Sequence, residues 1–572
     1  MSKLNKIFNS IPVTIPDRSG FDLSHESIGT ATTGTVIPVT HFEVLPGDTI
    51  SMGSMLSVSL PPFAVPFKGR IDAELTAAFI PYRLIWSGWQ NFITQNPGYQ
   101  TAAAIGTPGS APSSYLRSAF PLSVPVLTTG DSFSGDTAAY DAELAQYLPG
   151  SLADYLGVKA GAGRAGAALF PSSPNGISAL PFLAYHKFCD DWIRDDNNMK
   201  PYFSRDYYLG SFPDSNPAGS DGIATSAFSA TSAALLQSGR YLPFVNRDAS
   251  SRLSVRLQKP NLTGYSSSDI AGVPMDLSIG LGDLRQRCWA KDYFTTATTR
   301  PQAGAAAEVA FSTSAATGSF TISSLRAAES LQRWLERNNI AGTDYGSQIL
   351  AHFGVTPPDA TLNRSVLLGS FRTPVMVNAV ENNSNAEATS TRNPFGSALG
   401  SAAGFGSANE SGKLIDDFSP KEHGIIMVFF TLIPHAYYNS GIDRQLLHIN
   451  YGDFAWPEFA GIGDQPIYGS ELNTTGGSTI FGYNQRYSEM KFKLDRISGL
   501  LEDGSSLDVY ALQRGFSQAV PSLGSSFLEI PKDYLDQVMA VTTAQSGFSC
   551  IFDCYFDCSA IRVLPEYSLP KL

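Results

Sequence analysis

Three cysteines near the end of the chain have the residue type and spacing that could bind a metal ion or supply a nucleophile. Cys550, Cys554 and Cys558 alternate with Phe552 and Phe556 in the run FSCIFDCYFDCS. A period of two, rich in Phe, Ile and Tyr, favours a β-strand over a helix. Cysteines four apart on a strand lie about 13 Å from one another, whereas each zinc ligand lies about 2.3 Å from the metal. The spacing predicts a buried Phe/Cys face in which cysteine acts as a small hydrophobic residue.

Residues 407–414, SANESGKL, resemble a phosphate-binding loop at first sight. That motif needs Gly at the position of Ser407 and Ser or Thr at the position of Leu414. We therefore predict a flexible loop without nucleotide chemistry, inside a Gly/Ser/Ala-rich segment, 382–412, that is predicted to be loop-like throughout. Gly396, Gly400 and Gly404 form GxxxG units, but their polar neighbours do not make a membrane helix.

The histidines are scattered and have neither HExxH nor any other metal spacing. The sequence also lacks a GxSxG nucleophile elbow and a dinucleotide fingerprint. We expect structural histidines, no catalytic residue, no metal ion and no cofactor. A carboxylate pair assembled by the fold for glycoside hydrolysis stays open, because spacing does not reveal such a pair. The seven histidines are His25, His41, His186, His352, His423, His435 and His448.

The composition is that of a folded protein with large protein–protein contacts. Hydrophobic residues make up 43% of the 572 residues and charged residues 16%, below the roughly 25% charged residues of a typical soluble protein. Interfaces deplete Lys and Glu and enrich aromatic residues, so a subunit buried on several sides would have this composition. The net charge of −12 argues against a dedicated nucleic-acid-binding protein, which needs a basic face for phosphates.

Neither a membrane span nor a secretion signal is visible. The longest apolar run, residues 424–434 (GIIMVFFTLIP), is too short to cross a bilayer and predicts a buried strand. The first twenty residues lack the apolar core of a signal peptide, so we expect synthesis and assembly in a cytoplasm and no membrane insertion. The odd count of five cysteines fits reduced thiols.

Strand patterns at both ends of the chain predict a mainly β fold, one barrel interrupted by long insertions. Residues 71–79 alternate as a half-buried strand, and Leu45-Pro46-Gly47-Asp48 is a turn. Helices are predicted at 182–193 and 322–338, the latter ending before Gly342. The predicted division is an N-terminal arm with the first strands (1–95), inserted loops and a helix (96–200), an insertion (201–283), helices and loops (284–420) and C-terminal strands (421–572).

Short motifs in a fixed order extend across nearly the whole chain. They are FDLSH (21–25), VLPGD (44–48), FIPYRLIW (79–86), SLADYLG (151–157), ISALPF (177–182), WIRD (192–195), DYFT (292–295), ILAHFGVTPPD (349–359), EHG (422–424) and FGYNQRYSE (481–489). This series resembles the major capsid protein of the Microviridae, in its gokushovirus-like branch. One departure concerns the subfamily: DYFT is followed by TATTRPQ at 296–302, where S-C-L-P-x-P-Q is expected.

The resemblance implies a structural protein and no enzyme. Members of that family build a T=1 icosahedral shell from sixty copies of an eight-stranded antiparallel jelly roll around a circular single-stranded DNA genome, in the virion of a bacteriophage. The implied partners are other copies of the chain, single-stranded DNA bound without sequence preference, a small basic DNA-binding phage protein, a DNA pilot protein and a host surface receptor. Assembly is implied to occur in the cytoplasm of the host bacterium.

By position, residues 201–283 correspond to the insertion that forms a three-fold protrusion in the gokushovirus-like branch. Its aromatic residues are candidates for a trimer contact or a receptor-facing surface, or they pack a small core of the insertion itself. Lys3 and Lys6 are candidates for facing the genome, although disorder or contact with a neighbouring subunit fits them equally. The aromatic candidates are Tyr207, Tyr208, Phe212, Phe228, Tyr241, Phe244 and Tyr265.

Two other classes of protein compete with the capsid interpretation. A secreted β-sandwich carbohydrate-active enzyme would have a signal peptide and an aromatic platform beside a carboxylate pair. A phage spike or receptor-binding protein would be an elongated trimer rather than a closed shell.

Overall fold

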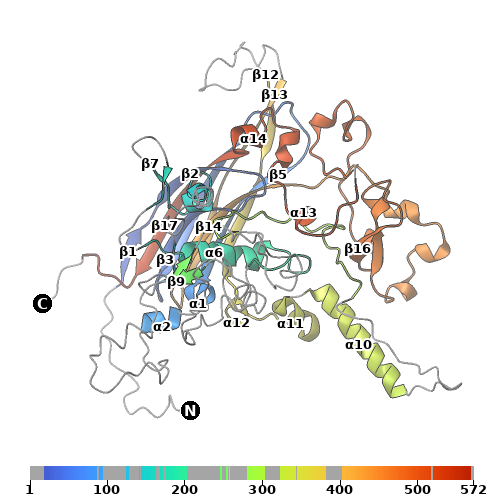
Figure 1. Ribbon diagram of the computed structural model, residues 1–572, viewed down its shortest axis with the longest axis horizontal. Helices are drawn as coiled ribbons and strands as arrows, with labels where there is room; N and C mark the ends of the chain where they lie inside the picture. Colours follow the sequence, from blue (N-terminus) through green and yellow to red (C-terminus); the bar gives the residue numbers. More distant parts are fainter. Residues whose placement is uncertain are drawn as a thin grey trace.

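The computed structural model shows two antiparallel sheets packed face to face, with helices and long loops around them (Figure 1). Most strands pair with partners that are far away in the sequence, so the two ends of the chain meet in one sheet. The structure describes residues 18–86, 89–94, 124–127, 141, 144–162, 168–171, 176–202, 245–247, 253–255, 257, 280–302, 322–342, 344–381, 402–516 and 519–567.

The first sheet joins strands from the N-terminal, middle and C-terminal parts of the chain. Its central strands are, in spatial order, β2 (His25–Ala31), β17 (Cys550–Arg562), β4 (Thr49–Ser59) and β13 (Ala402–Phe418). Two further strands extend it, β1 (Ser19–Asp22) beside β17 and β12 (Met376–Glu381) beside β13.

The second sheet has the spatial order β3 (Ile37–Val44), β14 (Gly424–Pro434), β5 (Ile71–Pro81) and β11 (Val366–Pro374). Along the chain the main strands alternate between the two sheets, except that β5 and β11 follow each other within the second one: β2, β4, β13 and β17 lie in the first sheet, and β3, β5, β11 and β14 in the second. Eight antiparallel strands connected in this way form a jelly roll. The predicted fold class is confirmed.

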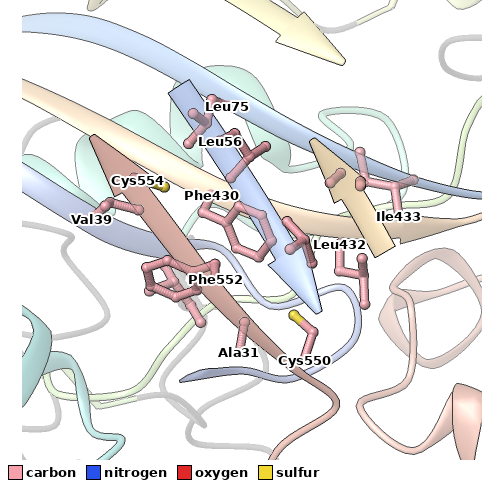
Figure 2. Packing of buried hydrophobic residues seen from close by; sticks show 14 of the residues in the cluster. Ala31, Val39, Leu56, Leu75, Phe430, Leu432, Ile433, Cys550, Phe552 and Cys554 are labelled. Atoms are coloured by element: carbon pink, nitrogen blue, oxygen red, sulfur yellow. The ribbon is translucent and has the colours of Figure 1, made fainter. Parts of the chain in front are cut away.

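The core lies between the inner faces of the two sheets. In Figure 2, Phe430 of β14 stacks on Phe552 of β17 with ring centroids 4.9 Å apart, and Leu56 and Leu75 close the space from β4 and β5. Period-two alternation places every second residue of β4 and β17 in this core. The first sheet is therefore apolar inside and largely polar outside.

The two central strands of the second sheet, β5 and β14, are buried on both faces, which corrects the half-buried strand predicted at 71–79. Their outer face is covered by α1 (Tyr82–Ile85) and α6 (Leu180–Phe188), which continues as a π-turn, Cys189–Ile193. Phe188 of α6 stacks on Phe429 of β14 at 3.8 Å with nearly parallel rings. Because even-numbered β5 residues face this layer, β5 and β14 have no solvent-exposed side.

Several local predictions are confirmed. The run at 424–434 is the buried strand β14, and the turn at 45–48 joins β3 to β4 with Gly47 at φ +87°. The helix predicted at 182–193 is α6 with its π-turn. The helix predicted at 322–338 is α10 (Ile322–Ala341), which Gly342 follows at φ +91°.

The loop predicted at 382–412 is wrong from Ala402 onward, where β13 begins. Between residues 404 and 412 the buried residues of this strand are Gly404, Gly406 and Ala408, and the larger buried side chains, Leu414 and Ile415, come only after this stretch. A Cβ atom at Gly404 would lie 3.1 Å from the Phe63 side chain, so the strand packs its backbone where a side chain would not fit. With almost no apolar side chains on the buried face, the alternation that identifies a strand is invisible in the sequence.

Between β14 and β17 the chain forms a second core beside the jelly roll. Only residues 480–484 of the strand-like run 478–494 are a strand, β16 (Ile480–Asn484), paired with β15 (Gln465–Tyr468). The core of this region also takes Tyr293 and Phe294. Its helical turns are Arg444–Leu447, Tyr451–Asp453, Pro457–Phe459, Gly469–Glu471, Ser488–Met490, Gly499–Leu501, Asp508–Tyr510, α13 (Ser525–Leu528), Tyr534–Gln537 and α14 (Thr543–Ser546).

Short elements complete the described part of the chain, and the division into five regions stays a prediction. Two pieces of the 201–283 region, β9 (Val245–Arg247) and β10 (Leu253–Val255), form a small sheet with β6 (Val126–Leu127). The remaining elements are α2 (Trp89–Thr94), α5 (Leu152–Tyr155), β7 (Gly161–Ala162), β8 (Ala168–Leu169), α11 (Tyr345–Phe353) and α12 (Asp359–Leu362).

Removing the ring of Phe430 should destabilise the subunit strongly. Phe430→Ala leaves a cavity between the sheets, and we expect a loss of about 3–5 kcal/mol in the free energy of unfolding, measured by urea unfolding of the isolated subunit. Tyr555→Ala on the outer face of β17, where Tyr555 is 47% exposed, is the control and should cost about 0.5 kcal/mol. Equal losses would contradict the placement of the core.

Candidate functional site

The three C-terminal cysteines lie in the core, as predicted. Cys550, Cys554 and Cys558 point inward from β17 and are buried, with Cys550 and Cys554 visible in Figure 2. Burial raises the pKa of the Cys554 thiol to about 12 and that of Cys558 to about 11. A thiol must lose its proton to attack or to bind a metal, so these side chains are hydrophobic packing groups.

The segment that resembles a phosphate loop is part of β13. Its backbone from Ser407 to Lys413 pairs with β4, residue by residue, so its N–H groups are not arranged as a cradle for an anion. Gly404 of the GxxxG run lies against Phe63, while Gly396 and Gly400 lie outside the described residues.

Five of the seven histidines, His25, His186, His352, His435 and His448, have a hydrogen-bond or ion-pair partner within the fold. His25 contacts the Thr40 hydroxyl at 2.7 Å, and buried His186 contacts the Leu281 carbonyl at 2.7 Å and the Arg285 guanidinium at 3.0 Å. Since Arg285 Nε donates to Nδ1, the His186 ring is neutral and its Nε2 carries the proton. Within the described residues, no three His, Cys, Asp or Glu side chains are grouped so as to hold a metal ion. None of the described helices is long and apolar enough to span a bilayer.

Two buried carboxylates on β5 have the proximity that acid–base catalysis requires. Glu74 accepts hydrogen bonds from Arg287 at 2.6 Å and from Arg372 at 2.8 Å. Asp72 accepts from Arg70 at 2.9 Å and faces His435 at 3.1 Å. Burial opposes ionisation of Glu74, but the two guanidinium groups outweigh it and lower its pKa. A general acid needs a raised pKa, whereas the pKa of Glu74 is lowered. The ion pairs of this cluster therefore stabilise the sheet.

A small, partly open pocket lies in the second core, and its charged lining is internally paired. Arg444 binds Glu471 at 2.7 Å. Glu471 also accepts a hydrogen bond from Tyr293 at 2.7 Å. Arg496 contacts Asp443 at 3.2 Å. These ion pairs hold the segment around Arg444 to the second core.

The motifs that carry the resemblance meet in space and hold the fold together. Arg83 of PYRLIW binds Glu422 of EHG at 2.7 Å, joining the ends of β5 and β14. Asn484 of FGYN donates a hydrogen bond to the Tyr293 carbonyl of DYFT at 2.9 Å. Trp192 of WIRD donates to the Ser365 hydroxyl at 3.0 Å.

Asp292 is the centre of the DYFT turn. Its Oδ1 accepts the backbone N–H groups of Phe294 and Thr295 at 2.9 and 2.8 Å, and its Oδ2 accepts the Tyr438 hydroxyl at 2.7 Å. Arg514 in turn donates to that hydroxyl at 2.9 Å. In the departing run TATTRPQ, Thr298 pairs with Tyr483 through two backbone hydrogen bonds of 2.8 Å, so the run continues the same assembly of strands.

Among the described residues, a group of strongly exposed apolar side chains lies on the segment 446–462, in the region between β14 and β17. We call this segment the ridge. Leu446, Ile449 and Tyr451 are 75, 83 and 82% exposed. Three short 3₁₀ turns hold them there, and Trp456 donates a hydrogen bond to the Tyr451 carbonyl at 2.9 Å. The ridge is completed by exposed Phe454, Trp456, Phe459 and Ile462.

A second exposed apolar surface lies on α10 and α11. In Figure 1, α10 points away from the two sheets, at the lower right. The helix α11 buries none of its residues although its sequence is YGSQILAHF, and Phe353 is 79% exposed. The exposed apolar side chains of the two helices are Leu325, Leu331, Trp334, Ile340, Tyr345, Leu350 and Phe353.

A third group lies on the outer face of the first sheet. Ile551, Tyr555 and Ile561 of β17 are exposed, with Met55 of β4 and Ile28 of β2 on the neighbouring strands. Tyr555 and Met55 are direct partners across β17 and β4, and exposed apolar side chains that lie together in this way are typical of protein–protein contact sites. The clusters of charged side chains described above are paired within the fold, and the exposed apolar surfaces are the candidate functional surfaces of the described residues.

The chain belongs to the family of phage capsid proteins described as capsid protein (F protein), which it matches over residues 9–115 and 132–572. It is 25% identical to capsid protein VP1 of Chlamydia phage 1 over 637 residues, covering 100% of this chain and 98% of the relative. It is 26% identical to capsid protein VP1 of Bdellovibrio phage phiMH2K, over 98% of this chain and 97% of that protein. It is 24% identical to capsid protein VP1 of Spiroplasma virus 4, over 100% of this chain and 99% of that protein.

These relatives confirm the resemblance to the Microviridae major capsid protein. The chain is a structural capsid protein of the virion and not an enzyme. The family decides against the carbohydrate-active enzyme and the spike protein. The aromatic candidates of the 201–283 insertion and the two N-terminal lysines, Lys3 and Lys6, lie outside the described residues, and their roles stay predictions. Sequence reasoning missed the ridge, although its apolar run LLHINYGDFAWPEFAGI was a visible signal.

The ion pairs of Glu74 should make stability depend on pH. A carboxyl whose pKa is lower in the folded protein than its ordinary value of 4.5 stabilises the fold above that value and loses this contribution as pH falls through the folded pKa. We expect Glu74→Gln to cost roughly 3–5 kcal/mol at pH 7, since it leaves two guanidinium groups without their carboxylate. The difference in the free energy of unfolding between Glu74→Gln and the unaltered chain should become smaller at acidic pH. A pH-independent difference in urea unfolding would contradict the ion-pair role.

The buried cysteines should resist thiol reagents. At pH 8 we expect negligible labelling of Cys550, Cys554 and Cys558 by iodoacetamide in the folded protein, because burial excludes the reagent and disfavours the thiolate. All three should label after unfolding in urea, as peptide mass spectrometry would show. Rapid labelling of the folded chain would mean that this face of β17 is open.

Proposed function

We propose that sixty copies of this chain assemble into a T=1 icosahedral shell around a circular single-stranded DNA genome. The observation that carries the proposal is the set of exposed apolar surfaces on a jelly roll of the capsid protein family. Such surfaces are costly in water and are covered when subunits meet. Symmetry repeats each contact many times, so moderate interfaces give a stable closed shell.

Because the chain is acidic, we expect other components to neutralise the charge of the genome. With a net charge of −12, the shell adds negative charge to that of the DNA phosphates, which require cations or basic proteins nearby. A small basic DNA-binding phage protein fits this role, and a DNA pilot protein is a further expected partner. Contacts between shell and DNA would be non-specific, to phosphates and stacked bases, with Lys3 and Lys6 as candidates. Assembly would take place in the cytoplasm of the host bacterium.

We also propose that the 201–283 insertion projects at the three-fold axes and contacts a host surface receptor. Support comes from its position between the α6 region and DYFT, as in the gokushovirus-like branch. Its aromatic residues would form either a trimer contact or the receptor-facing surface.

The assembly proposal is tested by the mass of the particle that the chain forms. Sixty copies of a 61.3 kDa chain give a protein shell of about 3.7 MDa. We expect particles of this mass from cells infected with the phage or expressing the chain with its phage partners, measured by mass photometry and negative-stain imaging. Only monomers, or shells of another subunit number, would contradict the proposal.

A further inference from the structure

The apolar stripe of α10 is only partly covered within the subunit. Near its C-terminal end, Leu335 is 8% exposed and Asn338 is buried, so this part packs against the body. One turn earlier on the same side, Leu331 and Trp334 are 48 and 51% exposed. The exposed stripe therefore continues a packed surface outward into solvent, along the part of the helix that points away from the sheets (Figure 1).

The chain just past the ridge contacts the C-terminal end of α10, where a Cβ atom at Gly463 would lie 3.5 Å from the Glu336 side chain. Asn339, near the end of the helix, donates a hydrogen bond to Asp464 at 2.9 Å, two residues past the ridge. The same Asn339 bonds the Arg300 carbonyl at 3.2 Å, which ties both elements to the second core. The helix and the ridge segment are thus two elements with exposed apolar side chains that are anchored next to each other at the C-terminal end of α10.

The charges of the two surfaces are complementary. The helix carries three arginines and two glutamates, of which Glu329 and Arg333 pair with each other at 2.7 Å. The ridge carries Asp453 and Glu458 and has no Lys or Arg. A helix with a net charge of +1 is attracted to a ridge with a net charge of −2, whereas two copies of the helix or of the ridge repel each other.

We propose that two copies of the chain meet across a two-fold axis, with the α10 stripe of each packed on the ridge of the other. The proposal rests on the shell proposed above, which contains two-fold axes, and names one of its contacts. Head-to-tail rings need the two complementary surfaces on different sides of the subunit. Here they are adjacent, and a two-fold contact covers both at once. The α10 stripe of each copy packs on the ridge of the other copy, so both surfaces of both copies are buried.

Cross-linking of assembled particles tests which chains meet. Particles are made from a mixture of chains carrying Leu331→Cys alone and chains carrying Ile449→Cys alone, and treated with a flexible bismaleimide. We expect a covalent heterodimer with a 331–449 peptide. The native cysteines give little background, since four of the five are buried. Absence of the heterodimer would overturn the proposal, because another chain segment or another protein would then cover the stripe.

Two matched controls sharpen the result. Arg333→Cys lies on the opposite side of the helix from Leu331, two residues away, and should give no heterodimer with Ile449→Cys. A chain carrying both Leu331→Cys and Ile449→Cys should stop at dimers, since a two-fold contact closes on itself. A ladder of trimers or pentamers would show a head-to-tail contact and overturn the two-fold arrangement.

A charged variant gives an independent readout. Leu331→Asp should abolish particles while leaving the thermal unfolding of the isolated subunit unchanged, because Leu331 is exposed there. Particles of Leu331→Asp at the yield of the unaltered chain would overturn the proposal. Failure of the unaltered chain to form any shell would instead count against the proposed function, so the two failures are distinguishable.

Discussion

Strands β5 and β14 have water removed from both of their faces, and the rest of the molecule is arranged around this constraint. The inner face of the two strands supports the sheet that contains β17, and the outer face supports α6. Register is fixed at Gly424, where a Cβ atom would lie 2.5 Å from the Phe79 ring and 2.6 Å from the Ile80 carbonyl. A shift by one residue would move a side chain into that space, so the apolar run can pair in one way.

Burial of this sheet also explains what the polar residues do. At the ends of β5 and β14, Arg83 pairs with Glu422, and Arg287 and Arg372 pair with Glu74. Packing removes these carboxylates from water in part or in full, and each of them is paired with a guanidinium group. The side chains that could have supplied chemistry are used to close the jelly roll and the second core. What remains for interaction is the exposed apolar surface, which suits a protein whose function is contact with other subunits.

The sequence predicted the elements whose large apolar side chains recur at the spacing of a strand or a helix. The runs at 424–434 and 550–558 reveal strands because their apolar residues are large, and α10 is revealed by its period and by Gly342. The first part of strand β13 was hidden because its buried residues are Gly404, Gly406 and Ala408, which lack large apolar side chains. The burial of both faces of β5 was hidden because Asp72 and Glu74 alternate with apolar residues, and this alternation is typical of a strand with one face in solvent. The ridge was missed because an apolar run without regular period gives no indication of its exposure until its neighbours are placed.

The central claim is that the exposed apolar surfaces of the subunit become covered between subunits. Backbone hydrogen exchange, compared between dissociated subunits and intact particles, tests this claim most directly. The account predicts strong protection of 446–462 and of α10 in the particle, with β17 equally protected in both states because its pairing is internal. Equal exchange of the ridge in subunits and particles would contradict the account.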